Sequence, residues 1–326
     1  MHLSIKYIGI CLFFLIFGLT LGYFLEPILN KVDEPPSASD VRLKENYQFI
    51  NPLLECAPDL KKSTQVKYLE NKLKDYVAQQ LGKKEASHIS VYYRDLNNGP
   101  TIGINEKEPF VPASLVKLPL MIAYFKISEE MPGILNTKVK IPKTETNLQQ
   151  NYEPNIPTIM DREYTLFELI ERMIEYSDNV PFDFLASHID PQKYIKIYND
   201  FGISNIGTDK GENILTVKDY SAFFRILYNS SYLNEEQSEQ ALGILTKTTF
   251  KDGLVAGVPE GTIIAHKFGE RGYQNSAEKQ LHDCGIVYHQ NGPYLLCVMT
   301  RGTDFQKLSS TIKEVSNEVY SFISLK

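Results

Sequence analysis

The chain has 326 residues, a formal net charge of −6 and 43% hydrophobic residues, which suffices for one large domain or two subdomains. Its mild acidity gives no indication of the basic patch that a nucleic-acid-binding protein needs, so no nucleic acid partner is expected. The six histidines are scattered along the chain, and the sequence therefore predicts no metal site and no other cofactor.

The first predicted element is an uncharged apolar segment at residues 8–25, which follows Lys6. Its length suits a membrane-spanning helix, and the flanking charges place the N-terminus in the cytoplasm. A cleaved signal peptide is the alternative, although Thr20-Leu21-Gly22 is a poor cleavage site. We expect residues 1–26 to anchor an extracytoplasmic domain at the membrane, or to leave it secreted if they are cleaved. Residues 27–58 are expected to form a flexible linker.

A folded domain is expected over residues 59–326. It opens with a helix at residues 64–81, in which apolar side chains recur at helical spacing. Two strands follow at residues 88–96 and 101–105. The next element is an apolar helical stretch at residues 115–125, and the proline at position 119 predicts that this helix starts tightly or kinks.

Ser114 lies at the N-terminus of this stretch, and Lys117 lies one turn later on the same face. The lysine can therefore reach the serine hydroxyl. It can act as a base only if burial or a second cation lowers its pKa. An ordinary N-cap serine followed by a solvated lysine is the alternative.

Residues 118–245 are predicted to form a mainly helical lobe. Thr165 and Glu168 form a capping box that opens one helix, and further helices are expected at residues 191–199 and after Thr216. Ser177-Asp178-Asn179 follows the first of these helices in a turn, where the same residue types also serve as ordinary turn residues.

A strand at residues 261–265 leads into Lys267-Phe268-Gly269. Because side chains alternate along a strand, Lys267 and Gly269 are expected to share a face toward a cleft, while Phe268 points away from Lys267. Gly269 is expected to let a substrate backbone lie close to the strand. A lysine at an exposed sheet edge is the alternative.

The last strands are predicted to form a hairpin around Asn291-Gly292. Counting back from this turn pairs Cys284 with Met299, so Cys284 and Cys297 are diagonal neighbours. They are then too far apart for an easy disulfide, and they are expected to be buried free thiols. Both faces of the hairpin are apolar, so the sheet should be covered on both sides. The sequence therefore predicts an α+β sandwich, in which N- and C-terminal helices cover an antiparallel sheet and an all-helical lobe completes the fold.

Three strings, S-x-x-K at Ser114, S-D-N at Ser177 and K-x-G at Lys267, stand in one order. In this order the chain resembles class A β-lactamases and penicillin-binding proteins from about residue 64 onward. The resemblance implies a β-lactamase/transpeptidase-like fold, with Ser114 as nucleophile and Lys117 as base. It further implies that Ser177 relays a proton, that Asn179 and Lys267 hold the substrate, and that the Glu270 backbone N–H completes an oxyanion hole with that of Ser114.

The chain departs from the family pattern at two places. Ser177 and Lys267 are separated by 267 − 177 = 90 residues, which leaves little room for the family's loop with the glutamate that activates the deacylating water. Glu212 is the carboxylate nearest the expected distance, and a solvated loop acid is its alternative role. Phe268 also stands where the family has a hydroxyl. Arg271 is a candidate for carboxylate recognition instead, with a surface arginine as the equal alternative.

The sequence thus predicts a serine hydrolase that acylates Ser114 with a β-lactam or a related amide or ester. The alternatives are a D-Ala-D-Ala-type peptidase or esterase with slow β-lactam turnover, and a non-catalytic surface binding module. The expected partner is a small-molecule or peptidoglycan-like substrate, together with the membrane through residues 8–25.

Overall fold

The computed structural model describes residues 41–42, 47–55, 63–97, 99–143, 150–203, 208–209, 212–273 and 275–325. The predicted membrane segment and residues 27–40, 43–46 and 56–58 of the predicted linker lie outside these residues. The prediction of a flexible linker is wrong for the residues that are described, because 41–42 pair with 53–55 as two strands and Ile50 is buried in a core. Within the described part of the chain, no helix is long and apolar enough to cross a lipid bilayer.

The centre of the fold is a five-stranded sheet in which every neighbouring pair is antiparallel. The strand order is β11 (Ile264–Tyr273), β12 (Ser276–Val287), β13 (Tyr294–Gly302), β3 (His88–Asp95) and β4 (Thr101–Ile104). β11 is therefore an edge strand, and it is the strand that carries Lys267.

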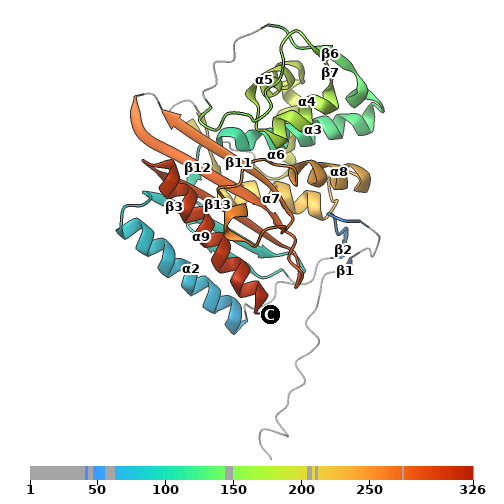
Figure 1. The fold of residues 1–326 in the computed structure, drawn as a ribbon. Helices are drawn as coiled ribbons and strands as arrows, with labels where there is room; N and C mark the ends of the chain where they lie inside the picture. Colours follow the sequence, from blue (N-terminus) through green and yellow to red (C-terminus); the bar gives the residue numbers. More distant parts are fainter. Residues whose placement is uncertain are drawn as a thin grey trace, which may run out of the picture. The chain divides into compact units, whose positions relative to one another are not determined.

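Helices α2 (Thr64–Gly82) and α9 (Phe305–Ser324) cover one face of the sheet (Figure 1). The other face meets the helical lobe, which contains α3 (Lys117–Glu130), α4 (Leu166–Glu175), α5 (Asn179–His188), α6 (Pro191–Asp200), α7 (Val217–Tyr228) and α8 (Glu235–Leu245). Short 3-10 helices are η1 (Ala113–Val116), η2 (Ile134–Asn136) and η3 (Val255–Gly257). The two-stranded pairs are β1 (Val41–Arg42) with β2 (Leu53–Glu55), β5 (Pro109–Phe110) with β10 (Leu215–Thr216), β6 (Lys138–Lys140) with β7 (Glu163–Thr165), and β8 (Thr208–Asp209) with β9 (Glu212–Asn213).

Two separate cores confirm the predicted α+β sandwich. One core joins the sheet to the apolar stripes of α2 and α9, with Leu73 and Val315 fully buried among its members. The other joins the opposite face of the sheet to the helical lobe and includes Tyr92, Leu295 and Phe223. Because strand side chains alternate between the faces, each central strand contributes to both cores.

The predicted register of the β12–β13 hairpin is wrong by two residues. Val287 pairs with Tyr294, and Cys284 therefore pairs directly with Cys297 rather than with Met299. The turn runs from His289 to Gly292, whose N–H donates to the His289 carbonyl at 2.9 Å, so Gln290 and Asn291 are its central residues. The turn is displaced by one residue, which shifts the pairing by two. The two cysteines consequently meet and form a disulfide, not the predicted free thiols.

Candidate active site

The turn that carries Ser114 is a single 3-10 turn, η1, placed directly before α3. Ala113, just before the serine, has a φ of 50°, in the left-handed region that costs a non-glycine residue free energy. Pro119 is the third residue of α3, and its missing N–H falls in the first turn, where α-helical N–H groups lack a partner within the helix. The predicted tight helix start is thus confirmed.

Side chains of β12 hold the chain just before this turn. The Val111 N–H donates to Gln280 Oε1 at 3.1 Å, and the Val111 carbonyl bonds to His282 Nε2 at 2.9 Å. Burial lowers the pKa of His282 to about 4, so the ring is neutral near pH 7 and donates from Nε2. Gln280 and His282 thus hold the turn that carries Ser114, here called the nucleophile turn, against the sheet. No sequence pattern revealed either role.

Lys117 lies at the centre of the site and is 1% exposed. Its Nζ lies 3.1 Å from Ser114 Oγ, 2.5 Å from the Ser177 carbonyl and 2.7 Å from Asn179 Oδ1. Burial lowers its pKa to about 7, although the carboxylates of Asp178, Asp183 and Glu270 oppose that shift. A neutral amine has two N–H donors and one lone pair. The two carbonyl oxygens accept the two donors, and the lone pair is left for the Ser114 hydroxyl.

The turn between α4 and α5 supplies Ser177 and Asn179. The predicted capping box of Thr165 and Glu168 opens α4, and Ser177 follows with a φ of 54°. The Asp178 carboxylate then caps α5 by accepting from the Val180 N–H at 2.9 Å, and it also accepts from the Thr158 N–H at 2.8 Å. Asp178 therefore holds the turn in the shape that presents its two neighbours to Lys117.

Lys267 reaches the same turn from β11. Its Nζ lies 2.8 Å from Ser177 Oγ, while Lys117 Nζ lies 3.3 Å from that oxygen. Burial lowers the pKa of Lys267 well below its usual value, and the nearby charge of Lys117 lowers it further. Ser177 Oγ thus bridges two buried lysines, which is the arrangement needed to pass a proton between them and a leaving group.

Gly269 has a packing role that differs from the substrate approach inferred from the sequence. A Cβ at this position would lie 2.7 Å from the Pro112 carbonyl oxygen and 3.1 Å from the Leu115 backbone nitrogen. Both distances are shorter than ordinary contacts, so only glycine lets β11 lie this close to η1. Gly269 therefore brings the lysine strand against the serine turn.

Phe268 lies on the face that strand alternation predicted, in the core shared with α2 and α9, but its ring is close to the Lys267 ammonium group. The Phe268 ring stacks on the Phe250 ring, with 4.3 Å between the ring centroids, and its centroid lies 5.9 Å from that of Tyr152. Lys267 Nζ lies 4.3 Å from the Phe268 ring centroid. The Lys267 side chain bends along β11, and its Nζ donates to the Phe268 carbonyl at 2.9 Å. This bend places the ammonium group beside the Phe268 ring. An aromatic wall therefore stands beside Lys267 where the family pattern has a hydroxyl.

Glu270 and Arg271 follow Gly269 on β11, which continues to Tyr273. The Glu270 carboxylate is buried and accepts from the Asn151 N–H at 2.6 Å and from the Asn151 side-chain amide. Gln150 from the same segment donates to the Ser177 carbonyl at 3.2 Å, so residues 150–151 were a part of the site that the sequence did not reveal. Arg271 lies over the Tyr273 ring at 5.0 Å. The expected oxyanion hole and the carboxylate role of Arg271 stay predictions.

The backbone of Glu212 lies in β9, paired with Asp209, and its side chain lies outside the described residues. β10 follows three residues later and pairs with β5, so Leu215 lies opposite Phe110. The described part of the chain holds no group of three His, Cys, Asp or Glu residues placed to bind a metal ion.

The lobe is mainly helical rather than all-helical as predicted, because β6 pairs with β7 between α3 and α4. An antiparallel sheet, this mainly helical lobe and a serine–lysine–serine–lysine chain where they meet define the class of penicillin-recognising serine enzymes. The chain belongs to the β-lactamase enzyme family, whose model matches residues 68–323.

Curated relatives and solved structures agree with this membership. The chain is 24% identical over 272 residues to the β-lactamase VEB-1 of Pseudomonas aeruginosa, covering 74% of this chain and 85% of that protein. It is 25% identical over 232 residues to the β-lactamase Toho-1 of Escherichia coli, covering 67% and 77%. The fold is similar to that of PBP-A, with a TM-score of 0.68 and 21% identity over 82% of this chain and all of that one. The TLA-3 extended-spectrum β-lactamase gives the same TM-score and identity, over 78% and 98%.

Proposed function

We propose that the protein is a serine hydrolase that forms an acyl-enzyme at Ser114 with a β-lactam. The observation that carries the proposal is the position of Lys117, buried with Nζ 3.1 Å from Ser114 Oγ. Neutral Lys117 removes the hydroxyl proton as the oxygen attacks the lactam carbonyl. Ser177 then donates its hydroxyl proton to the leaving nitrogen and takes one from protonated Lys117, whose Nζ lies 3.3 Å from Ser177 Oγ. Lys267 donates a hydrogen bond to the same oxygen. The curated relatives VEB-1 and Toho-1 are β-lactamases, which supports this substrate class.

Deacylation is proposed to be slow. Only 16 residues, 201–216, connect α6 to α7, and Glu212 is their candidate for activating the hydrolytic water. The neighbouring structure of a PBP-A mutant is an acyl-enzyme complex with penicillin G, so in that protein this fold holds a penicillin acyl group. The alternative for the present chain is a D-Ala-D-Ala-type peptidase or esterase acting on peptidoglycan-like substrates, with β-lactams as slow substrates.

Substrate selection is proposed to differ from the family pattern because of Phe268. A ring stacked on Phe250 presents an apolar surface beside Lys267, and it cannot donate the hydroxyl hydrogen bond of the family pattern. Recognition of a substrate carboxylate would then depend on Lys267 and Arg271. We expect weaker acylation by carboxylate-bearing penicillins than a hydroxyl at position 268 would give.

The domain is further proposed to work outside the cytoplasm, held at the membrane by residues 8–25 or released by their cleavage. The disulfide between Cys284 and Cys297 supports this proposal, because stable disulfides form mainly in oxidising compartments. Expression of the whole chain, followed by separation of membranes and intact-mass measurement, tests it. A full-mass chain in the membrane fraction supports the anchor, a shorter soluble chain supports the signal peptide, and a full-mass cytoplasmic chain contradicts both.

The central experiment is intact-mass spectrometry of the protein after incubation with a fluorescent penicillin, beside the Ser114→Ala variant. A stable adduct on the wild type alone supports an acyl-enzyme with slow deacylation. Catalytic consumption of penicillin without an adduct supports hydrolysis but contradicts slow deacylation. If neither adduct nor consumption is found, β-lactam acylation is wrong, and a general esterase or a binding module becomes the better explanation.

A further inference from the structure

His266 is a buried histidine with one ring nitrogen unused. Its Nδ1 lies 2.8 Å from Asp283 Oδ1, and both side chains are at most 1% exposed. The other Asp283 oxygen accepts from the Leu254 N–H at 2.9 Å. A carboxylate accepts only, so the His266 proton resides on Nδ1. The second nitrogen, Nε2, is buried and has no hydrogen-bond partner among the described residues, which costs free energy unless something fills the site.

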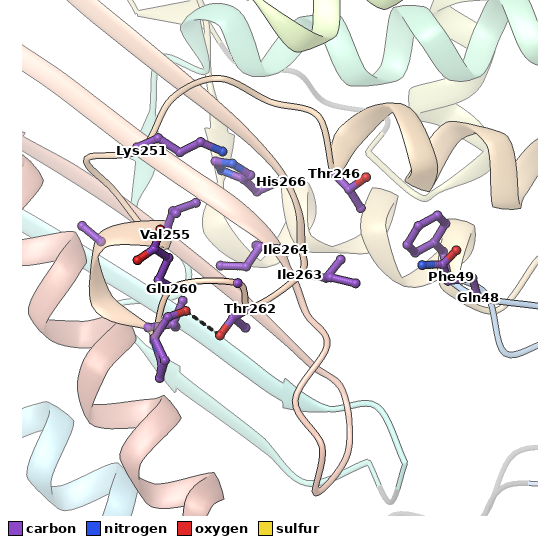
Figure 2. A pocket seen from close by; sticks show the side chains of 14 residues that line it. Gln48, Phe49, Thr246, Lys251, Val255, Glu260, Thr262, Ile263, Ile264 and His266 are labelled. Carbon is purple, nitrogen blue, oxygen red and sulfur yellow. Dashed lines mark hydrogen bonds between the residues drawn. The ribbon is translucent and has the colours of Figure 1, made fainter.

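His266 lines a cavity of about 740 Å³ (Figure 2). None of Ser114, Lys117, Ser177 and Lys267 lines it, so it is separate from the candidate active site. Its walls come from the segment after α8, from the start of β11 and from residues 48–49, and half of the lining residues are apolar. The apolar members are Phe49, Val255, Ala256, Val258, Pro259, Ile263 and Ile264. A cavity of this size accepts a small organic molecule.

The charge in this cavity is carried by Lys251. The lysine is exposed, and its side chain points toward His266 (Figure 2). It donates to the Thr248 carbonyl at 3.0 Å, and no acidic residue in the described part of the chain forms an ion pair with it. Glu260 is the only carboxylate among the lining residues, and it is exposed. The end of the cavity near His266 is therefore cationic.

We propose that this cavity binds a small carboxylic acid with an apolar chain. Bound with one proton, the acid satisfies both groups, because the proton lies between one of its oxygens and His266 Nε2 while the other oxygen faces Lys251. Asp283 then carries a negative charge and Lys251 a positive one, while the ligand, its shared proton and His266 are together neutral. The site therefore has no net charge. The apolar chain lies against the wall around Ile264. The site is directly behind Lys267, which follows His266 on β11.

Isothermal titration of the whole chain with hexanoate and with the neutral ester methyl hexanoate tests the proposal. We expect one saturable hexanoate site and at least tenfold weaker binding of methyl hexanoate, because the ester has no proton to donate to His266 Nε2 and no charge to face Lys251. Acetate, which lacks the chain, should also bind at least tenfold more weakly. Equal affinity for hexanoate and methyl hexanoate, or no saturable hexanoate binding, would overturn the proposal.

Two lysine variants and the magnetic resonance signals of the His266 ring nitrogens show whether hexanoate binds in this cavity. Lys251→Met should weaken hexanoate binding at least tenfold, while leaving penicillin labelling of the protein unchanged. Lys247→Met is the matched control, since that lysine pairs with Glu171 at 2.9 Å and does not line the cavity. The ring nitrogen signals of His266 should shift as hexanoate is added. Unchanged binding in Lys251→Met, or unshifted His266 signals during saturable binding, would contradict the assignment.

Discussion

Lys117 shows how burial alone prepares a base. The side chain is enclosed by the nucleophile turn, the α4–α5 turn and β11, and this enclosure is the largest cause of its lowered pKa. The sequence pointed to a second cation as one possible cause. In the structure the charge of Lys117 lowers the pKa of Lys267, and the repulsion between the two cations is mutual. The two lysines share Ser177 Oγ, so protonation of both at once is unfavourable.

Acylation should therefore depend on pH through Lys117. Below its pKa of about 7 the amine is protonated and has no lone pair for the Ser114 proton, so the acylation rate should rise with pH through this value and then level off. Lys117→Met should lower the rate by roughly 10²–10⁴-fold and abolish the rise. Stopped-flow measurement of penicillin acylation across pH tests both expectations.

Lys193→Met, which removes an exposed lysine paired with Glu130, serves as the control and should keep the wild-type profile. A flat profile for the wild-type protein would contradict a basic role for Lys117.

At the scale of elements, the site depends on how closely β11 and η1 approach each other. Gly269 sets this distance, because any side chain would meet the backbone of Pro112 and Leu115. β11 and η1 are otherwise joined through the side chains of Lys117, Lys267 and Ser177. A small separation of β11 from η1 would therefore change the distances between these side chains. Catalysis is sensitive to displacements of about 1 Å.

Gly269→Ala should lower the free energy of unfolding by roughly 1–3 kcal/mol, as overpacking does, and slow acylation at the same time. Gly82→Ala is the matched control. Gly82 is the last residue of α2, and a Cβ there meets nothing within 4 Å, so that variant should be neutral or slightly more stable. Denaturant unfolding and acylation rates measured on both variants test this. Equal behaviour of the two would show that the close approach is unimportant.

The sequence predicted those elements whose cause is local. The capping box of Thr165, the apolar stripe of α2 and each of the three motifs lie within a short stretch of chain. Asn151 could not be found in this way, because its contact with Glu270 joins residues 119 positions apart. The prediction of the hairpin register was wrong for another reason. Asn291-Gly292 is a strong turn signal, yet the turn forms one residue earlier, and both registers keep the same apolar residues on the same faces because they differ by two.

At the scale of the whole molecule, the sheet links the helical lobe to the layer formed by α2 and α9. β12 and β13 make this connection near the site. Gln280 and His282 of β12 form hydrogen bonds with the nucleophile turn, and Asp283 of β12 forms one with His266. The disulfide between Cys284 and Cys297 ties these two strands together on the face toward the helical lobe. It therefore stabilises the strand that holds both the turn carrying Ser114 and the side chain of His266.

Removing this disulfide should weaken the whole fold. The Cys284→Ala/Cys297→Ala double variant should unfold with a free energy lower by about 2–4 kcal/mol, because the cross-link restricts the unfolded chain. Denaturant unfolding of the wild-type protein with and without reductant should show a similar loss, while reductant should leave the double variant unchanged. Peptide mapping after alkylation under denaturing conditions gives an independent check. The peptide that spans both cysteines should be lighter by two hydrogens and should resist alkylation until it is reduced, whereas its full alkylation without reductant would show that the two thiols are free.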